Sequence, residues 1–237
     1  MNNNSSFHPR AVITDVDGTI TDKSRRINLD SVSAIRNLVD NGIPVVFASG
    51  NTECSLSFLC KMTGTDGTII AENGGLYRIT YAGERKICSD RAACLEAYEI
   101  VRRYYEEDGL ELQLYSPEYR FADIAFARTV DPGEVRDILS GMPVKILDSG
   151  FAIHIQSGDV NKATTFGLVA EEIGIPVSDF VAFGDSNNDR EMLEAAGLGV
   201  AVAGGQRGAV EAADLVSTKE YGDGFSEIIR DIFSSLF

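Results

Sequence analysis

The sequence predicts an α/β fold, in which a parallel sheet is covered by helices on both faces and an α+β domain is inserted into it. Two observations predict this fold. In residues 1–80 and 157–237, short apolar segments alternate with segments of helical periodicity, which is typical of a parallel sheet buried on both sides. In residues 81–156, strand-like segments come in pairs, which is typical of antiparallel hairpins. We therefore expect a core of 1–80 and 157–237 and an inserted domain of 81–156.

The first elements of the expected core follow in the order strand, helix, strand. Residues 11–15 are a short β-like run, and residues 31–39 place apolar side chains at helical spacing. Gly42 ends that helix before a second apolar run at 43–48. A further helix-like segment leads to the apolar run 68–71. This alternation is what a parallel sheet with helical crossovers requires.

The last part of the chain repeats the pattern. An apolar run at 180–184 is followed by a helical segment at 187–195 and by another apolar run at 198–202. The inserted part differs, since one long helix and a shorter one accompany two strand pairs. We expect helices at 91–105 and from Asp131, and strands at 111–115, 121–126, 144–147 and 151–155.

Composition excludes several classes of protein. The chain has 237 residues, 44% hydrophobic and 24% charged, as in ordinary globular domains. Its net charge of -15 opposes binding to nucleic acid and to anionic membranes, so an anionic substrate needs a local positive site. The polar segment 1–10 does not resemble a secretory signal, and no apolar stretch is long enough to span a bilayer. We expect a cytoplasmic protein, and a homodimer is left open.

Polar side chains cluster at the expected carboxyl ends of strands, where open α/β sheets bind ligands. The carboxylates of Asp15, Asp185 and Asp189 could share a divalent cation, for which Mg2+ suits oxygen ligands. Ser49 can donate a hydrogen bond to a phosphoryl oxygen, and Lys162 can supply a cation. Each motif alone could be a solvated turn or a helix cap. Four such motifs, in this order and at strand ends, are hard to explain as solvated turns and helix caps.

This ordered set resembles the haloacid dehalogenase superfamily of phosphohydrolases, which has a core of Rossmann type. D15-V-D-G-T19 resembles its first motif, Ser49 its second, Lys162 its third and G184-D-S-N-N-D189 its fourth. The inserted segment lies between the second and third motifs, where one branch of the superfamily carries an α/β cap.

The resemblance implies roles for these residues. Asp15 would be the nucleophile that forms an aspartyl-phosphate, and Asp17 the general acid and then the base. Mg2+ would bind Asp15, the backbone carbonyl of Asp17 and Asp185, with support from Asp189. Ser49 and Lys162 would hold the phosphoryl group. We expect Gly50 and Asn188, from the second and fourth motifs, to line the same substrate site.

Further segments are similar to archaeal phosphoglycolate phosphatases, which hydrolyse 2-phosphoglycolate to glycolate. They are A71-E-N-G-G75, S149-G-F-A-I-H154 and S116-P-E-Y-R-F121, together with S49-G-N51. If the substrate is a small phosphorylated acid, its carboxylate needs a donor, and Arg120 is our candidate because a guanidinium binds a carboxylate in two-pronged fashion. His154 could line the cleft or be a hydrogen-bonded strand residue. Glu72 and Asn73 could edge the site, although a glycine-enabled turn also explains them.

Three other functions stay open at this point. A sugar-phosphate phosphatase or a phosphomutase could use the same core. A phosphate- or metal-binding regulator would need neither Asp15 as nucleophile nor Asp17 as acid. A nucleotide-binding dehydrogenase is disfavoured, because G197-L-G-V-A-V-A-G204 lacks the Gly-x-Gly-x-x-Gly spacing.

Overall fold

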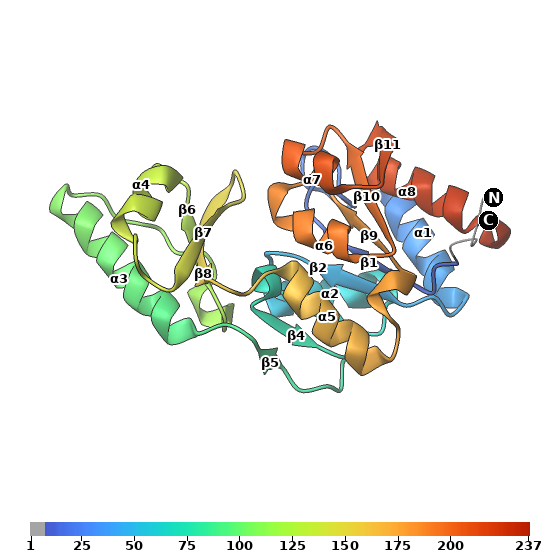
Figure 1. Ribbon diagram of the computed structural model, residues 1–237, viewed down its shortest axis with the longest axis horizontal. Coiled ribbons are helices and arrows are strands. Elements are labelled where there is room, and N and C mark those ends of the chain that lie inside the picture. Colours follow the sequence, from blue (N-terminus) through green and yellow to red (C-terminus); the bar gives the residue numbers. More distant parts are fainter. Residues whose placement is uncertain (1–7) are drawn as a thin grey trace, which may run out of the picture.

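The computed structural model describes residues 8–237, so most of the expected polar tail lies outside the described residues. Its main feature is an eight-stranded sheet in the order β11-β10-β9-β1-β2-β3-β4-β5 (Figure 1). The strands from β11 to β3 pair in parallel, and β4 and β5 add antiparallel pairs at one edge. Their bounds are β1 Ala11–Thr14, β2 Val45–Ala48, β3 Ile69–Ala71, β4 Leu76–Arg78, β5 Lys86–Ile87, β9 Phe180–Gly184, β10 Leu198–Ala203 and β11 Leu215–Glu220.

Helices cover both faces of this sheet, and the apolar runs of the strands explain why. Val12 of β1 packs toward one face and Ala11 and Ile13 toward the other, because successive side chains of a strand alternate. Buried side chains of α1, α2 and α8 pack on the Val12 face, and those of α5, α6 and α7 on the Ile13 face. The bounds are α1 Leu29–Asp40, α2 Glu53–Thr63, α5 Lys162–Ile173, α6 Arg190–Ala195, α7 Arg207–Ala212 and α8 Tyr221–Ile232. The predicted three-layer α/β core is thus confirmed.

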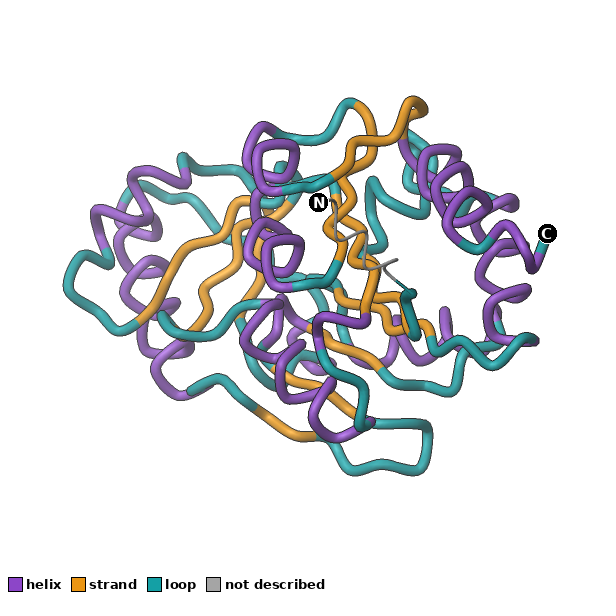
Figure 2. Tube along the Cα trace, turned by 45° about the vertical axis from the view of Figure 1, so that its right-hand side comes forward, coloured by secondary structure: helices purple, strands orange, loops and turns teal. Residues whose placement is uncertain are grey.

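A second, three-stranded antiparallel sheet has the order β6-β8-β7 and lies beside the large sheet (Figures 1 and 2). Alternation along β8 directs Ile153 and Ile155 into the apolar core that this sheet shares with its helices. His154 and Gln156 therefore extend from the opposite face, and Gln156 reaches the β3–β4 turn of the large sheet. The bounds are α3 Arg91–Glu107, β6 Ile124–Ala127, α4 Pro132–Ile138, β7 Val144–Asp148 and β8 Ala152–Ser157. We refer to this α+β unit as the cap.

One predicted strand is wrong. Residues 111–115 form no strand, and Leu114 makes only an isolated antiparallel bridge to Phe126. The predicted partner 121–126 is shortened as well, because β6 begins at Ile124. The physical reason is that the backbone N–H groups of residues 121–123 donate to the carboxylate of Glu72 instead of to a neighbouring strand.

Two further findings bear on the sequence predictions. β5 lies within the predicted inserted domain 81–156, but it pairs with β4 of the large sheet. The exact limits of the inserted domain stay a prediction. Within residues 8–237, no helix is long and apolar enough to cross a membrane.

Candidate active site

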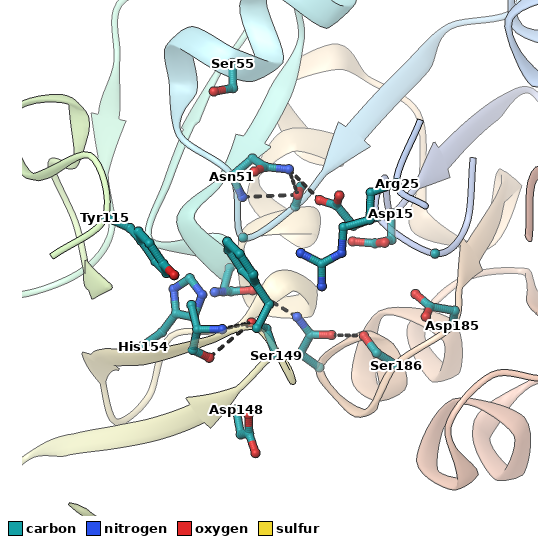
Figure 3. Close-up of a pocket in the computed structure, with 18 of the residues that line it drawn as sticks. Asp15, Arg25, Asn51, Ser55, Tyr115, Asp148, Ser149, His154, Asp185 and Ser186 are labelled. Carbon is teal, nitrogen blue, oxygen red and sulfur yellow. Dashed lines mark hydrogen bonds between the residues drawn. The ribbon is translucent and has the colours of Figure 1, made fainter. Parts of the chain in front are cut away.

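The carboxyl ends of three adjacent strands build the site. β9, β1 and β2 are neighbours in the large sheet, and Asp185, Asp15 and Ser49 follow them directly. Parallel strands end at the same edge, so residues far apart in sequence meet there. A cavity of about 510 Å³ opens at this edge, with walls from the core and from the cap (Figure 3). Of the predicted site residues, it is lined by Asp15, Asp17, Ser49, Gly50, Arg120, Asp185 and Asn188.

Three carboxylates and one ammonium group form the buried floor of the site. Asp15, Asp185 and Asp189 each place an oxygen within 4.8 Å of the others. Lys162 begins α5, and its Nζ donates to Asp15 Oδ1 and to Asp189 Oδ1, both at 2.6 Å. Lys162 and Asp189 do not line the cavity, since they are buried beside Asp15. The floor thus keeps an excess of negative charge that Lys162 alone does not neutralise.

The pKa values of these groups reflect that excess. Burial raises the pKa of Asp15 well above its usual value, and Asp189 and Asp185 add to the rise, while Lys162 opposes it. Burial together with Asp189 raises the pKa of Asp185 to about 7. For Lys162, burial lowers the pKa, but Asp15 and Asp189 outweigh burial and the net shift is upward. A cation bound between the carboxylates would relieve their mutual repulsion.

The donor set fits a hard divalent cation. Both oxygens of Asp189 are occupied, Oδ1 by Lys162 and Oδ2 by the backbone N–H groups of Asp185 and Ser186. Among the described residues, Asp15 Oδ2 accepts no hydrogen bond, and the carboxylate of Asp185 accepts only a 3.3 Å bond from Thr19. The oxygens that remain available on Asp15 and Asp185 are the kind of ligand that Mg2+ prefers. Asp189 would support the site by holding Lys162 and the loop after β9.

Asn51 connects the second motif to the first. Its Nδ2 donates to Asp17 Oδ2 at 2.7 Å and to Ser49 Oγ at 3.0 Å, and its backbone N–H also donates to Ser49 Oγ. With both of these bonds accepted, the hydroxyl hydrogen of Ser49 is left to donate into the cavity. Asn51 belongs to the S49-G-N51 segment, and sequence alone does not show that its side chain reaches Asp17.

The turn between β3 and β4 joins the core to the cap. Glu72, Asn73 and Gly74 all have positive φ angles. The Glu72 carboxylate is fully buried and accepts hydrogen bonds from the backbone N–H groups of Phe121, Ala122 and Asp123 in the cap. Asn73 accepts a hydrogen bond from Asn188 Nδ2 at 2.9 Å. Glu72 therefore fastens the cap, and Asn73 positions a predicted substrate-binding residue.

Arg120 and His154 lie on the cap side of the cavity and share one buried carboxylate. Arg120 Nη1 donates to Asp123 Oδ1 at 2.7 Å, and His154 Nδ1 is 2.8 Å from Asp123 Oδ2. Burial would raise the pKa of Asp123, but His154 and Arg120 outweigh burial and lower it. Arg120 also donates to the carbonyl oxygens of Gly50 and Tyr115. One Nη2 hydrogen of Arg120 is left over for a ligand.

Sequence reasoning missed Arg25, which lies in the loop between β1 and α1 and lines the cavity. Its guanidinium points into the cavity, on the same side as Asp15 (Figure 3). The guanidinium carbon lies 4.6 Å from the ring centre of Phe151, and Phe151 in turn stacks on Tyr115 at 5.0 Å. No motif marks Arg25, because it falls in the polar run T21-D-K-S-R-R26 after the first motif.

Comparisons with known proteins identify the family of the chain. The family described as haloacid dehalogenase-like hydrolase matches residues 12–131 and 134–229. A phosphoglycolate phosphatase of Methanoculleus marisnigri is 53% identical over 230 residues, which are 96% of this chain and 98% of that protein. A phosphoglycolate phosphatase of Methanospirillum hungatei is 47% identical over 224 residues, 94% of this chain and 97% of that one.

Solved structures show the same fold. A crystal structure of a Thermoplasma acidophilum protein has a TM-score of 0.84 at 24% identity and covers 97% of this chain and 100% of its own. A Bacteroides thetaiotaomicron protein, described among phosphatases of the haloalkanoate (HAD) enzyme superfamily, has a TM-score of 0.80 at 19% identity. The match covers 100% of this chain and 99% of that one.

The fold and the carboxylate-lined cavity define an enzyme of the hydrolase class. The chain belongs to the haloacid dehalogenase-like hydrolase family.

Proposed function

We propose that this protein is a Mg2+-dependent phosphatase that hydrolyses 2-phosphoglycolate to glycolate and phosphate through an aspartyl-phosphate. The observation that carries the proposal is the cluster of Asp15, Asp185, Asp189 and Lys162 at the strand ends, beside Asp17. The choice of substrate is supported by relatives called phosphoglycolate phosphatase, such as the one that is 53% identical over 230 residues.

The first half of the reaction uses both carboxylates of the first motif. Asp15 attacks phosphorus, so that an Asp15 O–P bond forms and the P–O bond to the leaving group breaks. Asp17 gives its proton to the leaving oxygen, which departs as the hydroxyl of glycolate. The hydrogen bond from Asn51 fixes the orientation of the Asp17 carboxyl group toward that oxygen.

The second half restores the enzyme. Asp17 takes a proton from water as the water oxygen attacks phosphorus, and the bond between Asp15 and phosphorus breaks to release inorganic phosphate. Ser49 and Lys162 bind phosphoryl oxygens, and Gly50 and Asn188 shape the site around them. A cation bound by Asp15, Asp185 and the carbonyl of Asp17 would supply charge stabilisation to the transferring group.

The cap supplies contacts to the rest of the substrate. Arg120 offers its remaining N–H to a small phosphorylated acid, and its bonds to Gly50 and Asp123 hold it at the border between cap and core. We further propose that residues 81–156 are the functional cap, that the protein is cytoplasmic, and that any homodimer leaves this cavity open to substrate.

A phosphate-release screen tests the proposed function. Small phosphorylated acids and sugar phosphates are assayed with Mg2+ and with EDTA, and 2-phosphoglycolate should give the highest kcat/KM, with activity lost in EDTA. Asp15→Asn should lower phosphate release by at least about 10³-fold, since it removes the nucleophile.

Other results would overturn parts of this proposal. Turnover of a hexose phosphate to an isomer with little free phosphate would indicate a phosphomutase. Full activity in Asp15→Asn would exclude the aspartyl-phosphate.

A further inference from the structure

We propose that Arg25 determines substrate specificity, because it binds the carboxylate of the substrate from the core side while the phosphoryl group lies at Asp15. This inference rests on the proposed function, because it names the group that recognises the second anionic end of the substrate. It adds a residue that neither the motifs nor the comparisons assign.

The two arginines that line the cavity differ in how many side-chain donors they have left. Arg120 uses four of its five N–H donors on Tyr115, Gly50 and Asp123, so it cannot bind a carboxylate with two parallel bonds. The Arg25 guanidinium makes no hydrogen bond or ion pair with any described residue, and it points into the cavity (Figure 3). The guanidinium of Arg25 is thus available to bind a carboxylate through two parallel hydrogen bonds.

The structure holds Arg25 in place although its guanidinium has no polar partner among the described residues. Arg25 has a φ of 60°, a left-handed conformation that costs a non-glycine residue energy. The turn is fixed by the bond from Arg25 N to the carbonyl of Asp22 and by two backbone bonds to the Asp22 carboxylate. The side chain then lies over Phe151, whose other neighbour in the stack is Tyr115.

The charges around the cavity also favour Arg25. The walls of the cavity carry several carboxylates, among them Asp17, Asp22 and Asp148, and a substrate with two anionic groups needs a positive charge for each. Lys162 is engaged by Asp15 and Asp189 on the phosphoryl side. Lys23 also lines the cavity, with no ion pair or aromatic partner in the part of the chain that the structure describes, but its ammonium is a point charge that cannot form two parallel hydrogen bonds. Arg25 is therefore the cation best suited to the carboxylate.

The Phe151 and Tyr115 rings make the orientation of the Arg25 guanidinium depend on the cap. Both belong to the cap, whereas Arg25 belongs to the core, so the stack spans the cavity mouth. Phe151 is 51% exposed, so its ring stays accessible from the cavity that it lines. The guanidinium is thereby pre-oriented only while the cap faces the core.

The test compares two substrates of nearly the same size, 2-phosphoglycolate and 2-hydroxyethyl phosphate, in which a hydroxymethyl group replaces the carboxylate. In Arg25→Gln, kcat/KM for 2-phosphoglycolate should fall about 10- to 100-fold, chiefly through KM, as expected for losing charge-assisted hydrogen bonds. For 2-hydroxyethyl phosphate it should fall less than about 3-fold, and Arg25→Lys should be intermediate. Equal losses on both substrates, or none, would overturn the proposal.

Arg26→Gln is the matched control. It removes the same charge from the same loop, but the Arg26 guanidinium pairs with Asp22 and does not line the cavity. Discrimination between the two substrates should stay at the wild-type level in this variant. A loss of discrimination equal to that of Arg25→Gln would show a general effect of charge and would overturn the proposal.

A binding measurement separates this inference from the proposed reaction. 3-Phosphonopropionate keeps both anionic ends but has no phosphoester bond, and calorimetry with Mg2+ should show about 10- to 100-fold weaker binding to Arg25→Gln than to wild type. If wild type binds it in this Arg25-dependent way but releases no phosphate from 2-phosphoglycolate, the proposed function fails and the inference stands. If wild type is active and the affinity is unchanged, the inference fails and the function stands.

Discussion

Glu72 illustrates how one buried side chain can set a property of the whole site. Its carboxylate is anchored by three backbone N–H groups of the cap, yet it lies near the carboxylate of Asp123. Burial, with Asp123 second, raises the pKa of Glu72 from 4.5 to about 7. The residue that fastens the cap to the core therefore changes charge in the neutral pH range.

This pKa shift predicts a pH-dependent stability. Between pH 4.5 and 7 folded Glu72 keeps a proton that the unfolded chain has released, so its contribution to stability is complete below 4.5 and is lost as the pH rises toward 7. The free energy of unfolding of wild type should fall by on the order of 3 kcal/mol relative to Glu72→Gln, which cannot titrate. Urea unfolding of both proteins at pH 5 and pH 8 measures this. A difference that is constant with pH would contradict the raised pKa.

The start of α5 contacts the β3–β4 turn. Asn161 caps α5 through its side chain, and the next residue is Lys162. Gly74 lies against this cap, with a φ of 93°, and its carbonyl accepts the hydroxyl of Thr165. The turn thus helps to set where the ammonium group meets Asp15 and Asp189.

Substituting Gly74 should disrupt this contact. A Cβ at Gly74 would stand 2.2 Å from the carbonyl oxygen of Asn161, so Gly74→Ala should lower the free energy of unfolding by about 3 kcal/mol or more and also reduce phosphate release. Gly42→Ala is the control, because Gly42 has a φ of 79° but no atom within 4 Å of such a Cβ. It should cost only about 1 kcal/mol, from backbone strain. Equal losses in thermal or urea unfolding would mean that close packing at Gly74 is unimportant.

The acidic floor of the site makes the folding stability of the whole protein depend on bound cations. Asp15, Asp185 and Asp189 converge from segments that are about 170 residues apart in sequence, so repulsion among them opposes folding. A cation that binds only the folded chain offsets that repulsion through mass action.

Removal of Mg2+ should therefore destabilise the protein. At a Mg2+ concentration about 100 times Kd, binding contributes about 2.7 kcal/mol, which for a chain of this size raises Tm by about 5–10 °C over the value in EDTA. In Asp185→Asn the rise should be much smaller, since one ligand is weakened. Differential scanning calorimetry in Mg2+, in EDTA and in matched KCl measures the effect. An identical Tm in Mg2+ and EDTA would argue against a metal site here.

The α/β class, most of the elements and the residues expected at the strand ends follow from patterns in the sequence. These patterns are informative because buried parallel strands are continuous apolar runs and because strand ends concentrate polar groups such as Asp15 and Asp185. Local signals also sufficed for the helix predicted at 91–105, which the structure shows as α3, capped by Asp90.

The other features depend on contacts between distant segments. Glu72 takes the backbone N–H groups that a strand at 121–123 would have used, and Arg120 is largely satisfied by Gly50 and Asp123. The Arg25 guanidinium, in contrast, has no hydrogen-bond partner among the described residues. A side chain's partners depend on which distant segment folds against it. The pattern of the sequence records which face a residue occupies, but it does not record which donors and acceptors remain free once the cap lies on the core.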